Sequence, residues 1–240
     1  MVDLSPLAWL LVVLGGALAG FIDSIAGGGG LITVPILAAV GLPPHLAIGT
    51  NKVQSVFGSG TAAVRYGRRG LIPWRKIAPG VLASVVCSAL GAWTVTRISP
   101  RLLEYLLPFL LTALWVYVAA RKRLGDTESH ARLPSGVFYP AAGTVLGFYD
   151  GFLGPGTGSF WTVAQVSLVG MDLKQATAAT KPSNFASNLG ALVYFLVFGS
   201  AVIPVGLAMA AGQIAGAVVG SRMVIYRRPR FIRPFFLTVV

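Results

Sequence analysis

Cysteine and histidine are scarce in this sequence of 240 residues, which contains one cysteine, Cys87, and two histidines, His45 and His130. A single cysteine cannot form an intramolecular disulfide, and two distant histidines do not make a metal cluster. The sequence also has no Ser/His/Asp set, and its glycine run at 27–30 is not a phosphate-binding loop because no Gly-Lys-Ser/Thr follows it. We therefore expect no enzymatic activity, no bound metal and no cofactor.

Charged residues of either sign are also few. They make up 11% of the chain, against 55% hydrophobic residues, whereas a soluble domain carries about 25% charged residues. So few charges cannot cover the surface of a soluble protein of this size. This excludes a cytosolic enzyme, a disordered tail and a secreted disulfide scaffold, and it predicts an all-α polytopic membrane protein.

The charges that are present are mostly positive, with 19 lysines and arginines against seven aspartates and glutamates. A nucleic-acid-binding protein presents its basic residues on one water-exposed face. Here they form short runs between apolar stretches, at 65–76, 121–132 and 222–233. Such runs are typical of cytoplasmic loops beside membrane spans. We therefore expect the lipid bilayer, and no nucleic acid, as a partner.

Apolar stretches divide the chain into candidate spans, each near the roughly 20 residues that cross the hydrocarbon core. Two shorter apolar pieces, at 31–42 and 159–170, follow glycine-rich breaks, and a last stretch begins near Phe231 and stops at Val240. No soluble domain fits between them. The full-length candidates are 7–26, 46–66, 77–97, 102–120, 137–153, 175–198 and 202–225.

The two halves of the sequence resemble each other. GFIDSIAGGGG at 20–30 matches GFYDGFLGPGTG at 147–158, and beyond the breaks an offset of 129 residues aligns Lys52 with Lys181. We divide the chain into a first transmembrane repeat (1–123), a cytoplasmic linker (124–136) and a second repeat (137–240). Compared with its counterpart, the last helix of the second repeat is expected to be truncated.

Positive charge changes places between equivalent loops. The loop at 65–76 carries five basic residues and its counterpart near 199–204 none, while 97–101 carries two and 222–233 five. Equivalent loops therefore lie on opposite sides of the membrane, which predicts inverted-topology repeats with an odd number of crossings each. Either each repeat crosses five times, or it crosses three times and adds a re-entrant hairpin around its glycine break. Both arrangements place the three basic loops in the cytoplasm and the N-terminus outside.

The glycine-rich breaks are the first candidate site. Irregular backbone at membrane depth is tolerated only where it is buried in protein or lines a cavity, and the ends of broken helices attract anions. We expect both breaks to be non-helical and to face each other at the protein centre. The alternative is tight helix packing that requires small residues. The candidate substrate-binding residues at the breaks are Gly28, Gly29, Gly30, Gly156, Thr157 and Gly158.

Two lysines inside predicted spans are the second candidate site. Lys52 and Lys181 lie about one and a half turns into their helices, among amide and hydroxyl side chains. Residues 52, 55 and 59 share a helix face, as do 181, 184 and 188. Two cations with free amide donors suit a small oxyanion. The alternative, which is compatible with the first, is a pair of structural bridges, Lys52 with Asp23 and Lys181 with Asp150. The candidate donors beside the lysines are Asn51, Ser55, Asn184 and Asn188.

Asp23 and Asp150 each precede a glycine break by four residues. Ionisable residues within a span are costly and often mark function, here proton or cation coupling. The favoured alternative is that each carboxylate caps the broken turn or pairs with a lysine. Thr50 and Thr180, beside the lysine motifs, belong to the same coupling or structural group.

These residues resemble the two signature regions of the TauE/SafE family of sulfite and organosulfonate exporters. The resemblance covers about residues 8–230 and implies a secondary transporter of the bacterial inner membrane that moves small sulfur-containing anions, with export as the expected direction. A proton or sodium is the candidate coupling ion, and the sequence determines neither the direction nor the coupling ion. The alternatives are a cation- or proton-conducting membrane protein that uses Asp23 and Asp150, and a membrane-embedded enzyme or assembly factor. Substrate identity and oligomeric state are left open. The family motif maps onto Asp23, Gly27 to Gly30, Pro35, Thr50, Asn51 and Lys52, and onto Asp150, Gly154, Gly156, Gly158, Thr180, Lys181 and Asn184.

Overall fold

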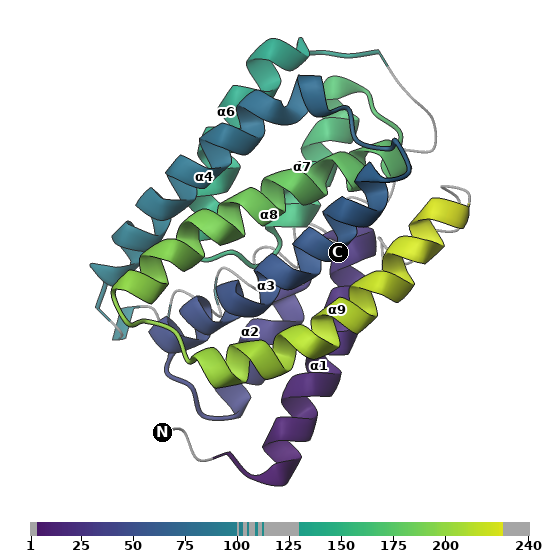
Figure 1. Ribbon diagram of the computed structural model, residues 1–240. Helices are drawn as coiled ribbons and strands as arrows, with labels where there is room; N and C mark the ends of the chain where they lie inside the picture. Colours follow the sequence, from purple (N-terminus) through teal and green to yellow (C-terminus); the bar gives the residue numbers. More distant parts are fainter. Residues whose placement is uncertain are drawn as a thin grey trace.

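The computed structural model describes residues 4–99 and 130–227, with positions 101, 102, 105, 109 and 112 between them. Within these residues the chain is helical and contains no strand (Figure 1). The predicted all-α class is therefore confirmed. Of the predicted helix at 102–120 only positions 102, 105, 109 and 112 are described, and positions 124–129 of the linker and the last apolar stretch from 231 lie outside the described residues.

The helices follow the predicted spans closely. In the first half they are α1 (Pro6–Ala26), α2 (Gly30–Ala39), α3 (Pro44–Gly67) and α4 (Trp74–Thr96). In the second half they are α6 (Ser135–Phe152), α7 (Thr157–Ala164), the π-helix η1 (Gln165–Val169), α8 (Leu173–Val197) and α9 (Ile203–Tyr226). Among the described helices, α1, α4 and α9 are long and apolar enough to cross a membrane. The similarly long α3 and α8 carry the candidate polar residues.

Helices of one half pack against helices of the other. In Figure 1, α1 runs along α9 and α4 runs along α6, while α3 and α8 lie together at the centre. Small residues allow this close packing: a Cβ on Gly20 would lie 2.1 Å from the carbonyl oxygen of Gln213, and one on Gly151 would lie 1.8 Å from that of Ser88. The repeat makes α1 equivalent to α6 and α4 equivalent to α9, so the two contacts correspond. The inversion of the repeats stays a prediction.

The helices after the glycine breaks are short. The 10 residues of α2 extend about 15 Å, which is half of the roughly 30 Å hydrocarbon core. The eight residues of α7 and the five of η1 have a similar reach. Each short element follows a longer helix, α1 or α6, and turns back at the break. Of the two predicted arrangements, these lengths favour the re-entrant hairpin.

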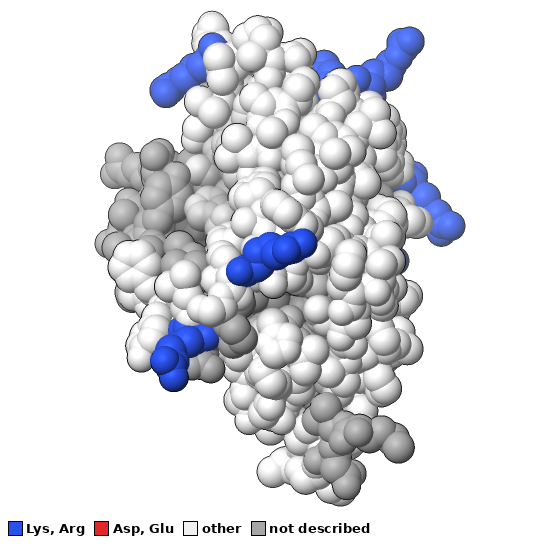
Figure 2. All heavy atoms as spheres, turned by 90° about the vertical axis from the view of Figure 1, so that its left-hand side faces the viewer, with Lys and Arg blue, Asp and Glu red and all other residues white. Residues whose placement is uncertain are grey.

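The outer surface is largely uncharged. Among the described residues, the face in Figure 2 shows a few scattered lysines and arginines, no aspartate or glutamate, and otherwise uncharged residues. Side chains such as Leu82 and Val145 are well exposed, at 69% and 65%, as expected for a surface in contact with lipid. This agrees with a membrane protein.

Basic residues gather at one end of the molecule. The Nε of Arg65 donates a hydrogen bond to the Oγ of Ser221 at 2.7 Å, and the guanidinium of Arg69 donates to the hydroxyl of Tyr226 at 2.5 Å. The C-terminal ends of α3 and α9 therefore lie side by side. The basic runs at 65–76 and 222–233, which include these helix ends, were both predicted to be cytoplasmic.

Candidate functional site

The two glycine breaks meet where the hairpins touch. Gly27 ends α1 with a φ of +80°, a left-handed conformation that favours glycine, and a Cβ there would lie 2.4 Å from the carbonyl carbon of Gly158. A Cβ on Gly30 would lie 3.0 Å from the Cα of Pro155. The expectation that both breaks are entirely non-helical is wrong at their edges, because α2 begins at Gly30 and α7 begins at Thr157.

Two buried ion pairs connect the halves crosswise. The Nζ of Lys52 on α3 lies 2.7 Å from Oδ1 of Asp150 on α6, and the Nζ of Lys181 on α8 lies 3.3 Å from Oδ2 of Asp23 on α1. Each ammonium also donates to the main-chain carbonyl of its aspartate. Both lysines are completely buried.

The crosswise pairing corrects the bridges expected from the sequence, which joined Lys52 to Asp23 and Lys181 to Asp150 within each repeat. The reason is the contact between the hairpin tips. It brings the break of the second repeat against the lysine of the first, so that a Cβ on Gly154 would lie 2.6 Å from the Nζ of Lys52. Each lysine therefore completes the hairpin of the other half.

The two carboxylates differ in how fully they are bonded. Asp150 accepts hydrogen bonds from the hydroxyls of Thr157, at 3.3 Å, and Ser187, and its side chain is 3% exposed. Asp23 accepts a long bond of 3.4 Å from the backbone N–H of Gly29, and its side chain is 13% exposed. The bond from Gly29 is the capping of the broken turn that the sequence suggested. Asp23 is the more accessible of the two carboxylates.

A small polar cavity lies between the breaks. The space open to the centre of a water molecule is about 20 Å³, which is room for about one water. Neither lysine is among the residues that line it, because both ammonium groups lie behind the carboxylates they pair with. The lining residues that the sequence analysis named are Asp23, Gly27, Gly29, Gly30, Asn51, Ser55, Ser59, Asp150, Gly154, Thr157, Gly158, Asn184 and Asn188.

Several candidate residues have other contacts. Gly28 and Gly156 do not line the cavity. The hydroxyl of Thr50 accepts a hydrogen bond of 2.9 Å from the backbone N–H of Val202, the N-cap residue of α9. The hydroxyls of Thr180 and Thr162 lie 3.2 Å apart, and the amide of Gln165 donates to Thr180 at 2.8 Å. Both threonines thus make contacts that hold helices together.

Gln213 on α9 also lines the cavity and was missed by the sequence reasoning. Its side chain crosses α3 at Gly58, where a Cβ would lie 2.3 Å from the Cγ of Gln213. The Oε1 of Gln213 and the Oδ1 of Asn184 are buried with no hydrogen-bond partner in the described part of the chain. Buried unpaired oxygens are costly, which indicates a site that is satisfied by a bound group. The sequence feature that could have identified Gln213 is that it is the one amide side chain in the apolar stretch 202–225.

Comparisons with known proteins agree with the resemblance seen in the sequence. A family model described as sulfite exporter TauE/SafE matches residues 12–240. The chain is 44% identical to the probable membrane transporter protein ORF9 of Sinorhizobium over 222 residues, which cover 92% of this chain and 85% of the relative. It is 41% identical to a probable membrane transporter protein of Haemophilus influenzae, with 91% and 86% covered.

The probable membrane transporter protein YfcA of Escherichia coli K12 is 38% identical over 235 residues, which cover 98% of this chain and 87% of YfcA. No solved structure matches the chain. The family match extends over nearly the whole sequence. The chain belongs to the TauE/SafE family of membrane transporters.

Proposed function

We propose that the protein is a secondary transporter that exports sulfite, organosulfonates or related oxyanions across the bacterial inner membrane through the central cavity. The observation that carries the proposal is the pair of completely buried lysines at the contact between the halves. In the described part of the chain, the ion-pair partner of each lysine is an aspartate of the other half. A movement of one half against the other therefore changes the charge available to an anion.

Charge balance sets a condition for anion binding. The two lysines and two aspartates together carry no net charge, and an anion that loses its hydration requires an attracting charge to offset that cost. One ammonium must therefore be released from its carboxylate before an anion binds. Because Asp23 is more exposed than Asp150 and makes fewer hydrogen bonds, we propose that a proton on Asp23 releases Lys181 and accompanies the anion.

Size sets a second condition. With room for about one water, the cavity does not hold an oxyanion in this conformation. Binding requires the hairpin tips to separate, which opens space between Gly27 and Gly158, whose backbones are in contact here. Separation of the tips and loss of the Lys–Asp pairs are then one event. The amides of Asn184 and Asn188 would supply neutral donors.

Sulfite flux into proteoliposomes tests the proposal. Wild-type protein is expected to carry sulfite, and Lys181→Met to lower the flux at least tenfold, since loss of a buried charged hydrogen bond costs about 2–5 kcal/mol. Lys76→Met is the matched control, because it removes the same charge from an exposed position in the first turn of α4. A pH-sensitive dye inside the vesicles should report proton movement with sulfite, and Asp23→Asn should abolish that signal. Equal flux in wild type and Lys181→Met would overturn the assignment.

A cation- or proton-conducting function is the second candidate, and one observation favours it. Two carboxylates and the unpaired amide oxygens of Asn184 and Gln213 line the cavity, and oxygen ligands of this kind suit a cation. Current recordings on the same proteoliposomes distinguish the two. A cation-selective current that does not depend on sulfite and is lost in Asp150→Asn would refute the exporter and support a cation-conducting protein.

A further inference from the structure

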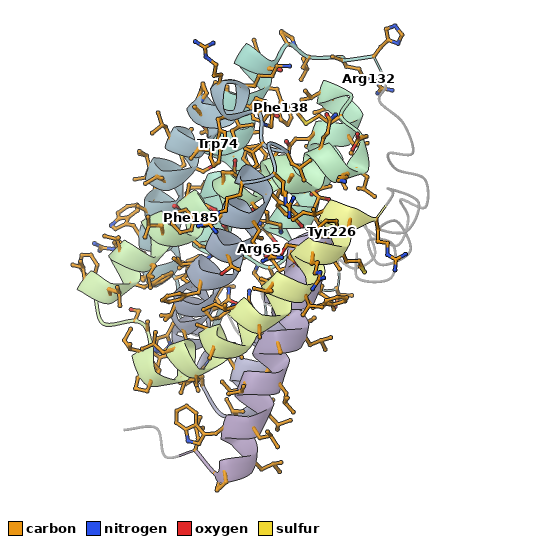
Figure 3. The ribbon with its side chains drawn as sticks, turned by 45° about the vertical axis from the view of Figure 1, so that its right-hand side comes forward. Arg65, Trp74, Arg132, Phe138, Phe185 and Tyr226 are labelled. Carbon is orange, nitrogen blue, oxygen red and sulfur yellow. The ribbon has the colours of Figure 1, made fainter. Side chains whose placement is uncertain are left out.

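A second recess lies on the outer surface of the helix bundle. It is a groove of about 520 Å³ between α3, α4 and α8, with Ala63 and Val64 on one wall and Val81, Pro182 and Phe185 on the other. It is some 25 times larger than the central cavity and, apart from Arg68, its lining side chains are apolar. Figure 3 shows Trp74 and Phe185 along the side of the molecule where this groove lies.

Small residues on α3 leave the space for this groove. A Cβ on Gly60 would lie 3.1 Å from the ring of Phe185, and one on Gly67 would lie 3.1 Å from the ring of Trp74. The groove therefore extends from Trp74, the first residue of α4, along α3 to Phe185, within α8. Trp74 is 52% exposed at the end predicted to be cytoplasmic, as expected for an aromatic residue at the membrane interface.

The cytoplasmic end of the groove is basic. Arg68 lines the groove and also a neighbouring polar pocket formed with Arg65, Arg69 and Tyr226. The side chain of Arg65 is fixed by Ser221, and the guanidinium of Arg69 lies 5.3 Å from the ring centroid of Tyr226. In Figure 3, Arg65 and Tyr226 lie next to each other.

These arginines have no counterion in the described part of the chain. The two ion pairs found there are both at the central cavity. Asp172, a described acid near the basic end, caps α8 through the backbone N–H of Gln175 at 2.8 Å. An apolar groove open to lipid thus ends at guanidinium groups without carboxylate partners.

We propose that the groove binds an anionic phospholipid, with one acyl chain along α3 and the phosphate at Arg68, Arg65 and Arg69. The apolar walls match a hydrocarbon chain, and the arginines match a phosphate by charge and by their planar donors. Basic pockets between helices on the cytoplasmic side suit anionic headgroups. The lipid would lie against Pro182, which directly follows Lys181, but its binding does not depend on the transported substrate.

Native mass spectrometry of the full-length protein in detergent tests this proposal with phosphatidylglycerol and phosphatidylcholine as probes. We expect wild type to retain one phosphatidylglycerol with at least fivefold higher affinity than phosphatidylcholine. Arg68→Gln should lower phosphatidylglycerol retention at least fivefold, and Val64→Trp, which fills the groove, should lower the retention of both lipids. Arg75→Gln is the matched control. It removes an exposed arginine at the start of α4, beside Trp74, that lines neither recess.

Three results would overturn the proposal. Equal losses of phosphatidylglycerol retention in Arg68→Gln and Arg75→Gln would show that the lipid is attracted to the basic surface in general. Equal retention of the two lipids would show that the arginines do not select the headgroup. Displacement of phosphatidylglycerol by inorganic phosphate, with no effect of Val64→Trp, would show a site for a free anion. Arg68 and Val64 are both exposed, so we expect the variants at these positions to keep the melting temperature of the wild type.

Discussion

Replacing Lys52 by methionine should destabilise the protein more than the equivalent change at Lys181. Methionine keeps the length of the side chain and removes its charge, so the partner aspartate remains buried without a cation. Both partner aspartates line the cavity, but the side chain of Asp150, the partner of Lys52, is 3% exposed, whereas that of Asp23, the partner of Lys181, is 13% exposed. Water can hydrate Asp23 more readily.

The expected size of the effect follows from the cost of a stranded buried charge. Removing one partner of such a pair lowers the free energy of unfolding by about 3–5 kcal/mol. The deeper pair, Lys52 and Asp150, should lie near the upper value and the other pair near the lower. For a chain of this length 1 kcal/mol corresponds to about 2–4 °C, so Lys52→Met should lower the melting temperature by about 10–20 °C and Lys181→Met by about 6–12 °C.

Double-mutant cycles test the crosswise pairing itself. The free energy of unfolding is measured by denaturant titration in detergent micelles for Lys52→Met, for Asp150→Asn and for both together. Residues in contact show coupling of about 0.5–3 kcal/mol, whereas residues without shared partners are additive within about 0.5 kcal/mol. We expect Lys52 to be coupled to Asp150 at 2.7 Å and additive with Asp23. Coupling of Lys52 to Asp23 instead would refute the pairing and the mechanism built on it.

Three further predictions concern other parts of the molecule. Gly27→Ala should abolish transport, because its Cβ would lie 2.4 Å from the backbone of the other break. Gly41→Ala, with a φ of +93° and open space around it, should cost only about 1–2 kcal/mol of stability and leave transport intact. Sulfite flux and the melting temperature check both variants. Gln213→Leu should change sulfite affinity without loss of folding if its unpaired oxygen takes part in binding, and calorimetry checks this. In a cysteine-free background, cysteines in place of Arg68 and Ser200 should be labelled from opposite sides of the membrane, and labelling from the same side would refute the inverted repeat.

Local sequence patterns were sufficient to predict the helices. The predicted spans 46–66 and 202–225 correspond to α3 (Pro44–Gly67) and α9 (Ile203–Tyr226), because an apolar helix in a membrane satisfies its own backbone hydrogen bonds wherever its neighbours lie. The glycine-rich breaks were also predicted from a local pattern. A run of residues without side chains leaves a helix without the packing that its flanks receive.

The sequence could not predict the arrangement of side chains across the halves. The spacing of Lys52 from Asp23 equals, within two residues, that of Lys181 from Asp150, so either pairing satisfies the pattern. The choice is made by the contact between hairpin tips, which depends on how α3 and α8 pack. Gln213 was missed for a related reason. It is the one amide of α9, whose Ser221, Arg222 and Tyr226 lie near the C-terminal end of the helix, and it reaches the cavity only because Gly58 on α3 leaves space for it.

The crosswise pairing has a consequence that bridges within each repeat would not have. If each lysine were paired within its own half, the halves could move apart with all buried charges still neutralised, and motion would leave the site electrically unchanged. With Lys52 held by Asp150 and Lys181 by Asp23, separation of the hairpin tips exposes two ammonium groups and two carboxylates together. Buried unpaired charges are too costly to persist, so an anion near the lysines and a proton on a carboxylate would stabilise the open form. In the proposed mechanism, transport and charge neutralisation would thereby be linked by the way the two halves are joined.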